Sequence, residues 1–404
     1  MTTVAELIQR DGLIVVCGSG GVGKTSISAA LGVLAATQTE KRVLVLTVDP
    51  AKRLANALGL REFGNVEVQI TSELFKTSKT KLRGSLSAAM IDTKASWDDL
   101  ISRHAPDEAT RNSVLQNSLY KNLTERFVHS HDYIAVERLY QAHSSGAYDL
   151  IIVDTPPSRN ALTILDAPKR MQDFFSSRLL KLLTANSQWQ LLTLAAKPFY
   201  EIADRLLGKG LLRDVAEFFT LFRTMETGFV ERAKKVEALL NDSKTSFAIV
   251  TTLEDAPLSE AEFLSVALKE RKFTTHLAIA NRIIPKELQG EVLVEQAGVL
   301  NNVRQNSEFI SELTEVLVNT DKSSETSSNT SSEIDEANLS KLLTQTLETI
   351  QNYAQETTKI SEMQSALLGR VAGFADNFTV APMLESDIAD INGLITLGEN
   401  LNIV

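Results

Sequence analysis

The sequence contains very little cysteine and no long apolar run. Cys17 is the single cysteine, which excludes a disulfide within the chain and leaves secretion without support. No apolar stretch approaches the roughly 18 residues that a membrane-spanning helix needs. The segment from Met1 to Arg10 also lacks the basic and then apolar pattern of a signal peptide. We therefore expect a cytoplasmic protein without stable membrane insertion.

Positive charge is also in deficit. The 404 residues include 41 Lys and Arg against 51 Asp and Glu, a net charge of −10 at pH 7. This balance does not attract a nucleic-acid backbone or an anionic membrane, so we expect neither partner. Apolar residues make up 43% and charged residues 23%, which is typical of a globular protein and excludes a disordered or fibrous chain. The length suits two or three domains, or one large α/β unit with an insertion.

Several short runs rich in Val, Ile and Leu predict buried strands. They are Leu13–Cys17, Val43–Thr47, Leu150–Val153, Phe247–Thr251, Leu277–Ala280 and Thr379–Ala381. Longer stretches with helical spacing separate these runs. This alternation predicts an α/β fold in which helices flank a mostly parallel sheet.

Two stretches are too long for single crossover helices and show no convincing strand. We expect residues 72–147 and 161–241 to form one inserted helical subdomain, whose Leu and Phe residues at helical spacing indicate core packing. Residues 1–71, 148–160 and 242–404 would then form the sheet-containing core. Within that core, residues 321–333 are almost purely polar and rich in Ser and Thr, which is typical of a flexible linker.

The clearest motif is a glycine-rich loop at residues 18–25, Gly-Ser-Gly-Gly-Val-Gly-Lys-Thr. Its spacing is that of a phosphate-binding P-loop, and it stands between a predicted strand and a predicted helix. Glycines let backbone N–H groups approach phosphate oxygens. Lys24 would reach the β- and γ-phosphates and Thr25 would ligate Mg²⁺. The candidate nucleotide-binding residues here are Gly20, Gly21, Val22, Gly23, Lys24, Thr25 and Ser26.

Two aspartates follow predicted strands at the same edge of the sheet. Asp154 ends the run at 150–153, in the position of an aspartate that holds Mg²⁺ through water, and Asp49 follows the run at 43–47. The chain contains no Asn-Lys dipeptide, the start of the element by which guanine-specific P-loop proteins recognise their base. We therefore predict ATP with Mg²⁺ as the cofactors.

These residues together resemble the ArsA family of ATPases, whose P-loop deviates from the common pattern. The family includes the arsenite-pump ATPase and the ATPase that delivers tail-anchored membrane proteins. Its P-loop, KGGVGKT, is similar to Ser19–Thr25. Its first switch, DPA, is matched at Asp49–Ala51, and its second switch, DTAPTGHT, resembles Asp154–Ala161. Its adenine-binding elements resemble Asn281, and Pro382 with Met383.

The resemblance implies roles for these residues. Asp49 would polarise the attacking water, Asp154 would serve Mg²⁺, and Asn281 would bind adenine. Asp49 and the phosphate-binding Lys24 are the predicted catalytic residues. It also implies ATP hydrolysis that rearranges two subunits and acts on a partner or a hydrophobic client. The partner subunit is a second copy of this chain or a paralogue.

Three departures from the family pattern affect these expectations. Ser19 replaces the family's extra lysine, whose charge crosses to the other subunit. Its loss should either slow hydrolysis or pass the task to another group. Arg53, Arg159 and a lysine-bearing paralogue are the candidates, and a structural or solvent-facing role fits the two arginines equally well. Asn160 replaces the switch histidine. The single cysteine leaves too few thiolates for a zinc-bridged dimer or for arsenite, so we expect no zinc.

Other sites and functions have weaker support. His129, His131 and His143 are close in sequence but lack a recognisable metal-ligand spacing. One alternative function is a positioning ATPase similar to ParA and MinD, although the C-terminal residues have no basic amphipathic face for a membrane. Another is a scaffold locked by nucleotide with negligible turnover.

Overall fold

The structure is a computed structural model that describes residues 3–48, 53–60, 66–76, 78, 80–117, 120–121, 128–177, 218–289, 291–323 and 336–401. The chain divides into two compact units. The first comprises Met1–Asn281, Val371–Val380 and Ser386–Val404, and the second comprises Arg282–Arg370 and Ala381–Glu385. Each unit is described separately below.

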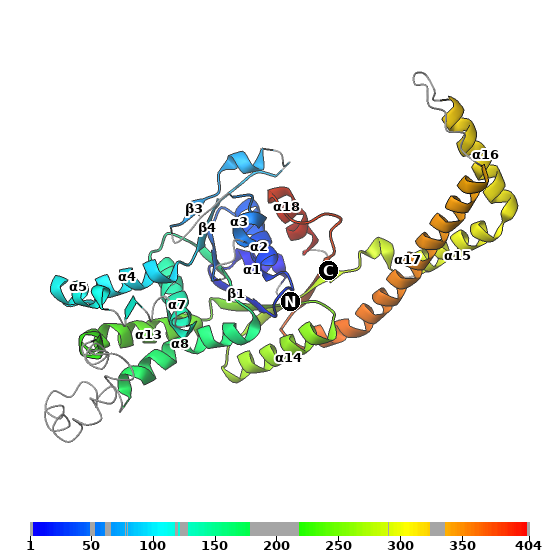
Figure 1. The fold of residues 1–404 in the computed structure, drawn as a ribbon. Helices are drawn as coiled ribbons and strands as arrows, with labels where there is room; N and C mark the ends of the chain where they lie inside the picture. Colours follow the sequence, from blue (N-terminus) through cyan, green and yellow to red (C-terminus); the bar gives the residue numbers. More distant parts are fainter. Residues whose placement is uncertain are drawn as a thin grey trace, which may run out of the picture. The chain divides into compact units, whose positions relative to one another are not determined.

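One eight-stranded sheet forms the centre of the fold, in the order β3-β4-β2-β5-β1-β6-β7-β8 (Figure 1). The strands are β1 (Gly12–Gly18), β2 (Arg42–Thr47), β3 (Val68–Gln69), β4 (Ser85–Met90), β5 (Leu150–Asp154), β6 (Thr245–Thr251), β7 (Thr275–Ile283) and β8 (Phe378–Pro382). The pairs from β4 through β2, β5, β1 and β6 to β7 are parallel, and the short β3 is antiparallel to β4. The predicted α/β fold with a mostly parallel sheet is confirmed, and each of the six predicted strands lies within an observed one.

Burial explains why these runs become central strands. Every residue of β1, β5 and β6 is buried, as expected where helices cover both faces of a parallel sheet. The helix α2 (Lys24–Gln38) connects β1 to β2 and is rich in small residues. A Cβ atom at Gly32 would collide with Val45 of β2, so glycine lets this helix approach the sheet closely.

The prediction that residues 72–147 contain no strand is wrong, because β4 lies within this stretch. Its sequence, Ser-Leu-Ser-Ala-Ala-Met, has none of the β-branched or aromatic residues that favour strands. Leu86, Ala88 and Ala89 are buried, and β4 pairs with β2 along its whole length. Pairing with an existing strand therefore decides the conformation of this segment against its weak intrinsic preference.

Helices around the sheet complete the first unit. They are α1 (Val4–Gln9), α2, α3 (Arg53–Ala57), α4 (Thr93–His104), α5 (Glu108–Gln116), α7 (Val128–Ser144), α8 (Ser158–Ser176), α13 (Glu226–Leu240), α14 (Asp255–Glu270) and α18 (Ile391–Asn400), with the 3₁₀ turn η1 (Ser72–Phe75). Helices α4, α5, α7, α8 and α13 belong to the same compact unit as the sheet. A separate boundary around the predicted helical subdomain stays a prediction.

Aromatic side chains form the core among these helices. Phe229 of α13 lies 5.0–6.4 Å, between ring centroids, from the rings of Trp97, Tyr133, Phe175 and Phe222. Phe175, Phe222 and Phe229 are buried. These phenylalanines are therefore core residues, as their spacing predicts. Residues 178–217 of the predicted helical subdomain, with further Leu and Phe residues at helical spacing, lie outside the described residues.

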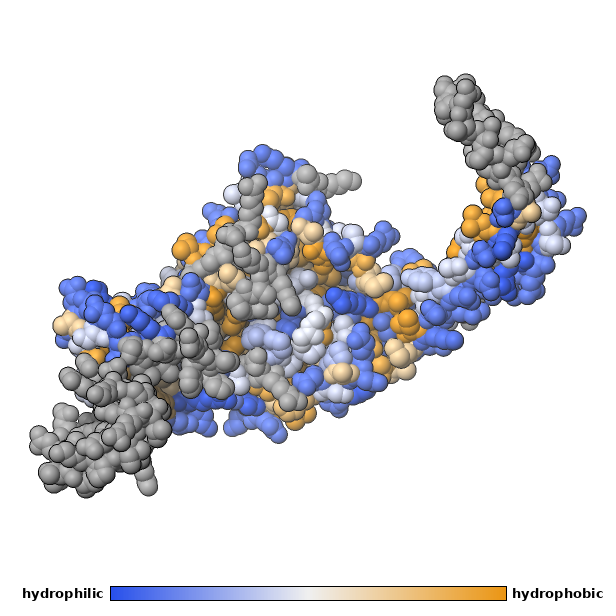
Figure 2. All heavy atoms as spheres, viewed as in Figure 1, coloured by the Kyte–Doolittle hydropathy of each residue, from blue (hydrophilic) through white to orange (hydrophobic). Residues whose placement is uncertain are grey.

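The second unit contains the last two residues of β7 and of β8, three helices and one 3₁₀ turn, η2 (Lys286–Leu288), among its described residues. The helices are α15 (Glu291–Gln305), α16 (Ser307–Ser323) and α17 (Glu336–Val371). The helix α17 has 36 residues. It buries Ala354, Thr357 and Ser361 on one side and exposes several apolar residues, including Tyr353 and Ile360. Orange patches over these helices show the apolar residues among polar ones in Figure 2.

The predicted flexible linker at residues 321–333 lies mostly outside the described residues. Residues 321–323 are the last residues of α16, and residues 324–335 lie outside the described part. Across the described residues, every helix is too short or too polar to pass through a bilayer.

Candidate functional site

The loop at residues 19–23 connects the end of β1 to the start of α2. Gly21 and Gly23 adopt left-handed backbone conformations, with φ values of +82° and +90°, which favour glycine. At Gly18 and Gly23 a Cβ atom would collide with the Val250 carbonyl oxygen and with the Asn281 side-chain amide. Gly18, Gly21 and Gly23 are therefore favoured by backbone conformation, by crowding or by both.

Lys24 is the first residue of α2, and its side chain folds back across the loop. Only 8% of this residue is exposed, and Nζ donates a hydrogen bond of 2.7 Å to the Ser19 carbonyl oxygen. The ammonium group thus lies beside the loop whose N–H groups would face a phosphate. This position combines a positive charge with the helix N-terminus, an arrangement that favours anions.

Asp154 joins three elements at the carboxyl edge of the sheet. It is fully buried, and its Oδ2 accepts hydrogen bonds of 2.8 Å from Thr25 Oγ1 and 2.9 Å from Thr47 Oγ1. Burying a carboxylate is costly unless such donors surround it. The structure therefore brings together Thr25 and Asp154, the two residues that the sequence predicts for Mg²⁺.

Thr47 is a site residue that the sequence analysis missed. It ends β2 and stands directly opposite Asp154 in the parallel register of β2 and β5. The strand β5 lies between β1 and β2, so the carboxyl ends of all three strands are neighbours. The sequence signal that could have identified Thr47 is a hydroxyl-bearing residue at the last position of the second strand.

The first switch begins immediately after this contact. The N–H of Val48 donates to the Asp154 carbonyl oxygen at 3.0 Å. Asp49, Pro50 and Ala51 lie outside the described residues, so the predicted role of Asp49 stays a prediction. Arg53 is the first residue of α3, and its side chain is also outside the described part.

The second switch lies against the P-loop. Thr155 Oγ1 donates to the Val16 carbonyl oxygen at 2.8 Å, and Pro157 Cγ is 3.7 Å from the position that a Cβ atom at Gly20 would take. Ser158 is the first residue of α8, and Arg159 and Asn160 follow in its first turn. The side chains of Arg159 and Asn160 are outside the described part.

Two buried hydroxyls near these loops have no hydrogen-bond partner among the described residues. They are Ser19 Oγ in the P-loop and Ser158 Oγ at the start of α8. Buried polar groups are usually paired, so each such oxygen needs an explanation. Ser19 is also the position at which the family resemblance expects a lysine.

The structure places one of the predicted adenine-binding residues at the P-loop. Asn281 of β7 is 7% exposed, and its Nδ2 donates a hydrogen bond of 2.8 Å to the Val22 carbonyl oxygen. Pro382 ends β8, and Met383 is 49% exposed, with its N–H donating to the Ile283 carbonyl oxygen at 2.8 Å. Adenine binding by these three residues stays a prediction.

Cys17 and the histidines were considered as nucleophiles or metal ligands. Burial raises the pKa of the Cys17 thiol to about 12, so the thiol is neutral and a poor nucleophile or metal ligand. The described residues contain no group of three His, Cys, Asp or Glu side chains that could hold a metal ion. The side chains of His129 and His131 are outside the described part, and the expected absence of zinc stays a prediction.

Known proteins are similar to much of this chain. The profile of the anion-transporting ATPase family matches residues 12–316, more than half of the chain. The putative arsenical pump-driving ATPase 2 of Aquifex aeolicus is 28% identical over 286 residues, which cover 68% of this chain and 81% of that protein. The ATPase get3 of Aspergillus terreus is 27% identical over 278 residues, covering 68% of this chain and 74% of that protein. The ATPase ASNA1 homolog 1 of Paramecium tetraurelia is 26% identical over 291 residues, covering 70% and 78%.

Proposed function

The chain belongs to the anion-transporting ATPase family, and from this premise we propose that it binds Mg·ATP at the loop between β1 and α2 and hydrolyses it. The observation that carries the proposal is the convergence of Lys24, Thr25 and Asp154 at the ends of β1 and β5. The backbone N–H groups from Gly20 to Ser26 would bind the phosphates, and Lys24 would stabilise charge that develops on them.

Thr25 and Asp154 fit a magnesium site by their chemistry. Mg²⁺ prefers hard oxygen ligands and keeps several of its waters. The Thr25 hydroxyl would ligate it directly, and the Asp154 carboxylate would hold one of its waters, as the sequence predicts. The contact of 2.8 Å between these side chains supports a shared role for them at one cation. A bound Mg²⁺ supplies positive charge to the β- and γ-phosphate oxygens.

The remaining roles rest on the sequence. Asp49 would polarise the attacking water, and Asn281, Pro382 and Met383 would bind the adenine. Asn281 is supported by its contact with the P-loop carbonyl of Val22. ATP rather than GTP is favoured because the chain lacks an Asn-Lys dipeptide.

We further propose that hydrolysis drives a rearrangement of two subunits that acts on a partner or a hydrophobic client. The partner subunit is a second copy or a paralogue whose lysine replaces the charge missing at Ser19. Arg53 and Arg159 are the candidates for this charge within the chain, because each lies at the start of a helix that follows a switch.

Calorimetry with Mg·ATP tests nucleotide binding. The wild-type protein should bind, and Lys24→Ala should bind at least about tenfold more weakly, because a charge-assisted contact to phosphate is lost. Lys76→Ala is the matched control, because this lysine is exposed and pairs with Glu73 away from the loop. Equal affinities for Lys24→Ala and the wild type would reject the proposal.

Hydrolysis is tested separately with Asp49→Asn. This variant should keep Mg·ATP affinity but release phosphate at least about a hundredfold more slowly, the usual effect of losing a catalytic base. Capture experiments with the same variant should also identify the partner, since it would hold the ATP-bound state. If the wild type and the variant turn over equally slowly, the nucleotide-locked scaffold replaces the ATPase as the favoured function.

A further inference from the structure

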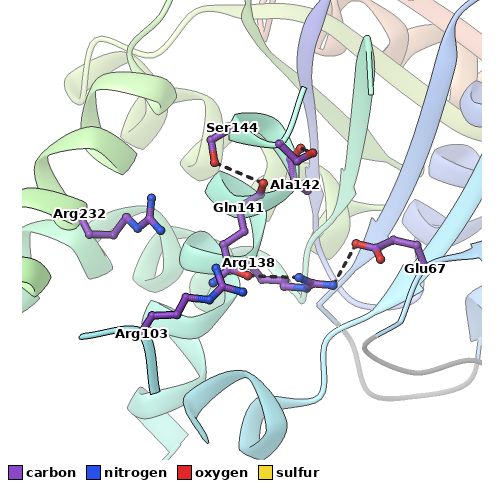
Figure 3. A pocket seen from close by; sticks show the side chains of 8 residues that line it. Glu67, Arg103, Arg138, Gln141, Ala142, Ser144 and Arg232 are labelled. Atoms are coloured by element: carbon purple, nitrogen blue, oxygen red, sulfur yellow. Dashed lines mark hydrogen bonds and ion pairs between the residues drawn. The ribbon is translucent and has the colours of Figure 1, made fainter. Parts of the chain in front are cut away.

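A cavity outside the nucleotide site gathers three arginine side chains. It has a volume of about 340 Å³ and is lined by Arg103 of α4, Arg138 of α7 and Arg232 of α13, together with Glu67 and Gln141. Figure 3 shows the Arg103 and Arg232 side chains directed towards Arg138 and Gln141 from two different helices (Figure 3). None of these residues belongs to the P-loop or to either switch. The volume is at the lower end of the range for ligand pockets, about 300–1,000 Å³.

Each of these arginines has a carboxylate neighbour. The ion pairs are Arg103 with Asp99 at 2.5 Å, Arg138 with Glu67 at 3.0 Å and Arg232 with Glu137 at 3.0 Å. A guanidinium group presents five N–H donors in a plane, so one carboxylate occupies only one side of it. Arg103 and Arg232 therefore keep N–H donors beyond those next to their carboxylate neighbours, and both residues line the cavity.

The pair between Arg232 and Glu137 is imperfect. Although Arg232 Nε is 3.0 Å from Glu137 Oε1, it makes no aligned hydrogen bond, and Glu137 Oε2 also has no hydrogen-bond partner among the described residues. Burial raises the pKa of Glu137, because its side chain is only 1% exposed. Arg232 is additionally held over the Tyr140 ring, 4.5 Å from the centroid. Its positive charge is thus only partly compensated within the fold.

From the convergence of Arg103, Arg138 and Arg232 on one cavity, we propose that this cavity binds a small anion that carries a phosphate or carboxylate group. Guanidinium groups match both groups geometrically, through paired N–H···O bonds. Arg103 and Arg232 are the principal contacts. Arg138, held in place by Glu67 and Gln141, lies beside them. Glu67 is the one carboxylate in the lining, and it opposes an incoming anion.

The test is calorimetry at low salt with inorganic phosphate and succinate as separate probes. The protein is first saturated with Mg·ADP, which occupies the P-loop, and Lys24→Ala is titrated in parallel. Phosphate binding at the P-loop would be lost in Lys24→Ala, whereas binding in the arginine cavity would remain. A preference for phosphate or for succinate then identifies which group the cavity accepts.

Two substitutions should change the affinity in opposite directions. Arg103→Gln should weaken binding about tenfold, because one charge-assisted contact is lost. Glu67→Gln should strengthen binding severalfold, because an opposing charge is removed. A folding defect would not produce this increase. Circular dichroism and thermal unfolding establish that the variants are folded.

Matched controls carry the same changes away from the cavity. Arg111→Gln removes an arginine of α5 that pairs with Glu108 as Arg103 pairs with Asp99, and Glu73→Gln removes an exposed glutamate. Both controls should bind the probes like the wild type. The proposal is overturned if neither probe binds, if Arg103→Gln binds like the wild type, or if Glu67→Gln fails to bind more tightly.

Discussion

Asp154 shows at the scale of single residues how the site depends on buried polar contacts. Its carboxylate is fully buried and takes hydrogen bonds from hydroxyls on α2 and β2. A buried charge of this kind is tolerated only with such donors. The same two donors fix the carboxylate where the P-loop begins its helix, so stability and the proposed magnesium chemistry rest on the same contacts.

Thr47→Val should test the contribution of β2 to this arrangement. Valine keeps the shape but removes the donor to Asp154, so the free energy of unfolding should fall by about 1.5–3 kcal/mol, the range for hydrogen bonds to charged groups. Thr37→Val is the control, because this buried hydroxyl donates only to carbonyls of its own helix. Urea unfolding measures both variants. Equal losses would contradict a special role for Thr47.

His104 provides a pH-dependent test in the helical region. Burial, and then the positive charges of Arg232 and Arg103, lower its pKa in the folded protein. Below the unfolded value of about 6.5, the unfolded chain binds a proton at His104 that the folded chain resists, so stability is lost as the pH falls. Above that value, the neutral form is present in both states and the effect vanishes.

The measurement is urea unfolding of the wild type and His104→Gln on both sides of the unfolded pKa. The wild type should lose more of its unfolding free energy on acidification than His104→Gln does, because glutamine does not titrate. His143→Gln, at the end of α7, controls for the removal of a histidine elsewhere. Parallel pH profiles for the wild type and His104→Gln would refute the expectation.

At the scale of elements, the P-loop shows how glycine permits a turn that other residues resist. Gly23 precedes α2 with φ at +90°, and the Asn281 amide occupies the space of its missing Cβ atom. The loop thereby links β1, α2 and β7. Side-chain crowding and a left-handed backbone act at the same position, so substitution there disturbs both the helix start and the contact with β7.

Gly23→Ala should therefore lower the free energy of unfolding by about 1–3 kcal/mol or more, because strain and a steric clash combine. It should also weaken Mg·ATP binding. Gly146→Ala is the matched control, since Gly146 has φ of +64° but open space around its Cβ position. Because only backbone strain acts there, Gly146→Ala should lower the free energy of unfolding by about 1 kcal/mol. Thermal unfolding with and without nucleotide measures both variants. Equal losses of stability in Gly23→Ala and Gly146→Ala would contradict the crowding argument.

At the scale of the whole molecule, the family profile and the compact units divide the chain differently. The profile ends at residue 316, within α16, whereas β8 and α18 lie beyond it. The helix α18 packs on α2, the helix that begins at the P-loop lysine, and belongs to the first unit. Residues outside the profile therefore complete the unit that carries the proposed site.

The number of chains in the assembly is the property of the whole molecule that tests the proposed function. If two copies close around nucleotide, Asp49→Asn with Mg·ATP should sediment with the mass of two chains, and the same protein with Mg·ADP should show a smaller share of that species. Sedimentation velocity measures both. A single-chain mass in both states would reject the homodimer and leave the paralogue as the proposed partner.

The sequence by itself determined the strands and loops that short local patterns of residues specify. Six strands were recognisable because short runs rich in Val, Ile and Leu are typical of buried strands. The P-loop was recognisable from the spacing of its glycines, of which Gly18, Gly21 and Gly23 adopt backbone conformations that other residues rarely tolerate. Lys24, Thr25 and Asp154 followed from their spacing along strand, loop and helix. These residues come together because parallel strands end at one edge, a property that the order of elements already implies.

Only the tertiary structure decided the contacts between segments that are distant in sequence. β4 is a strand because β2 offers it a backbone partner, which Ser-Leu-Ser-Ala-Ala-Met does not reveal. Thr47 becomes a partner of Asp154 through the register of β2 and β5, and Arg103, Arg138 and Arg232 converge through the packing of three helices. Register and packing depend on the whole set of neighbours, and no local run of residues carries that information.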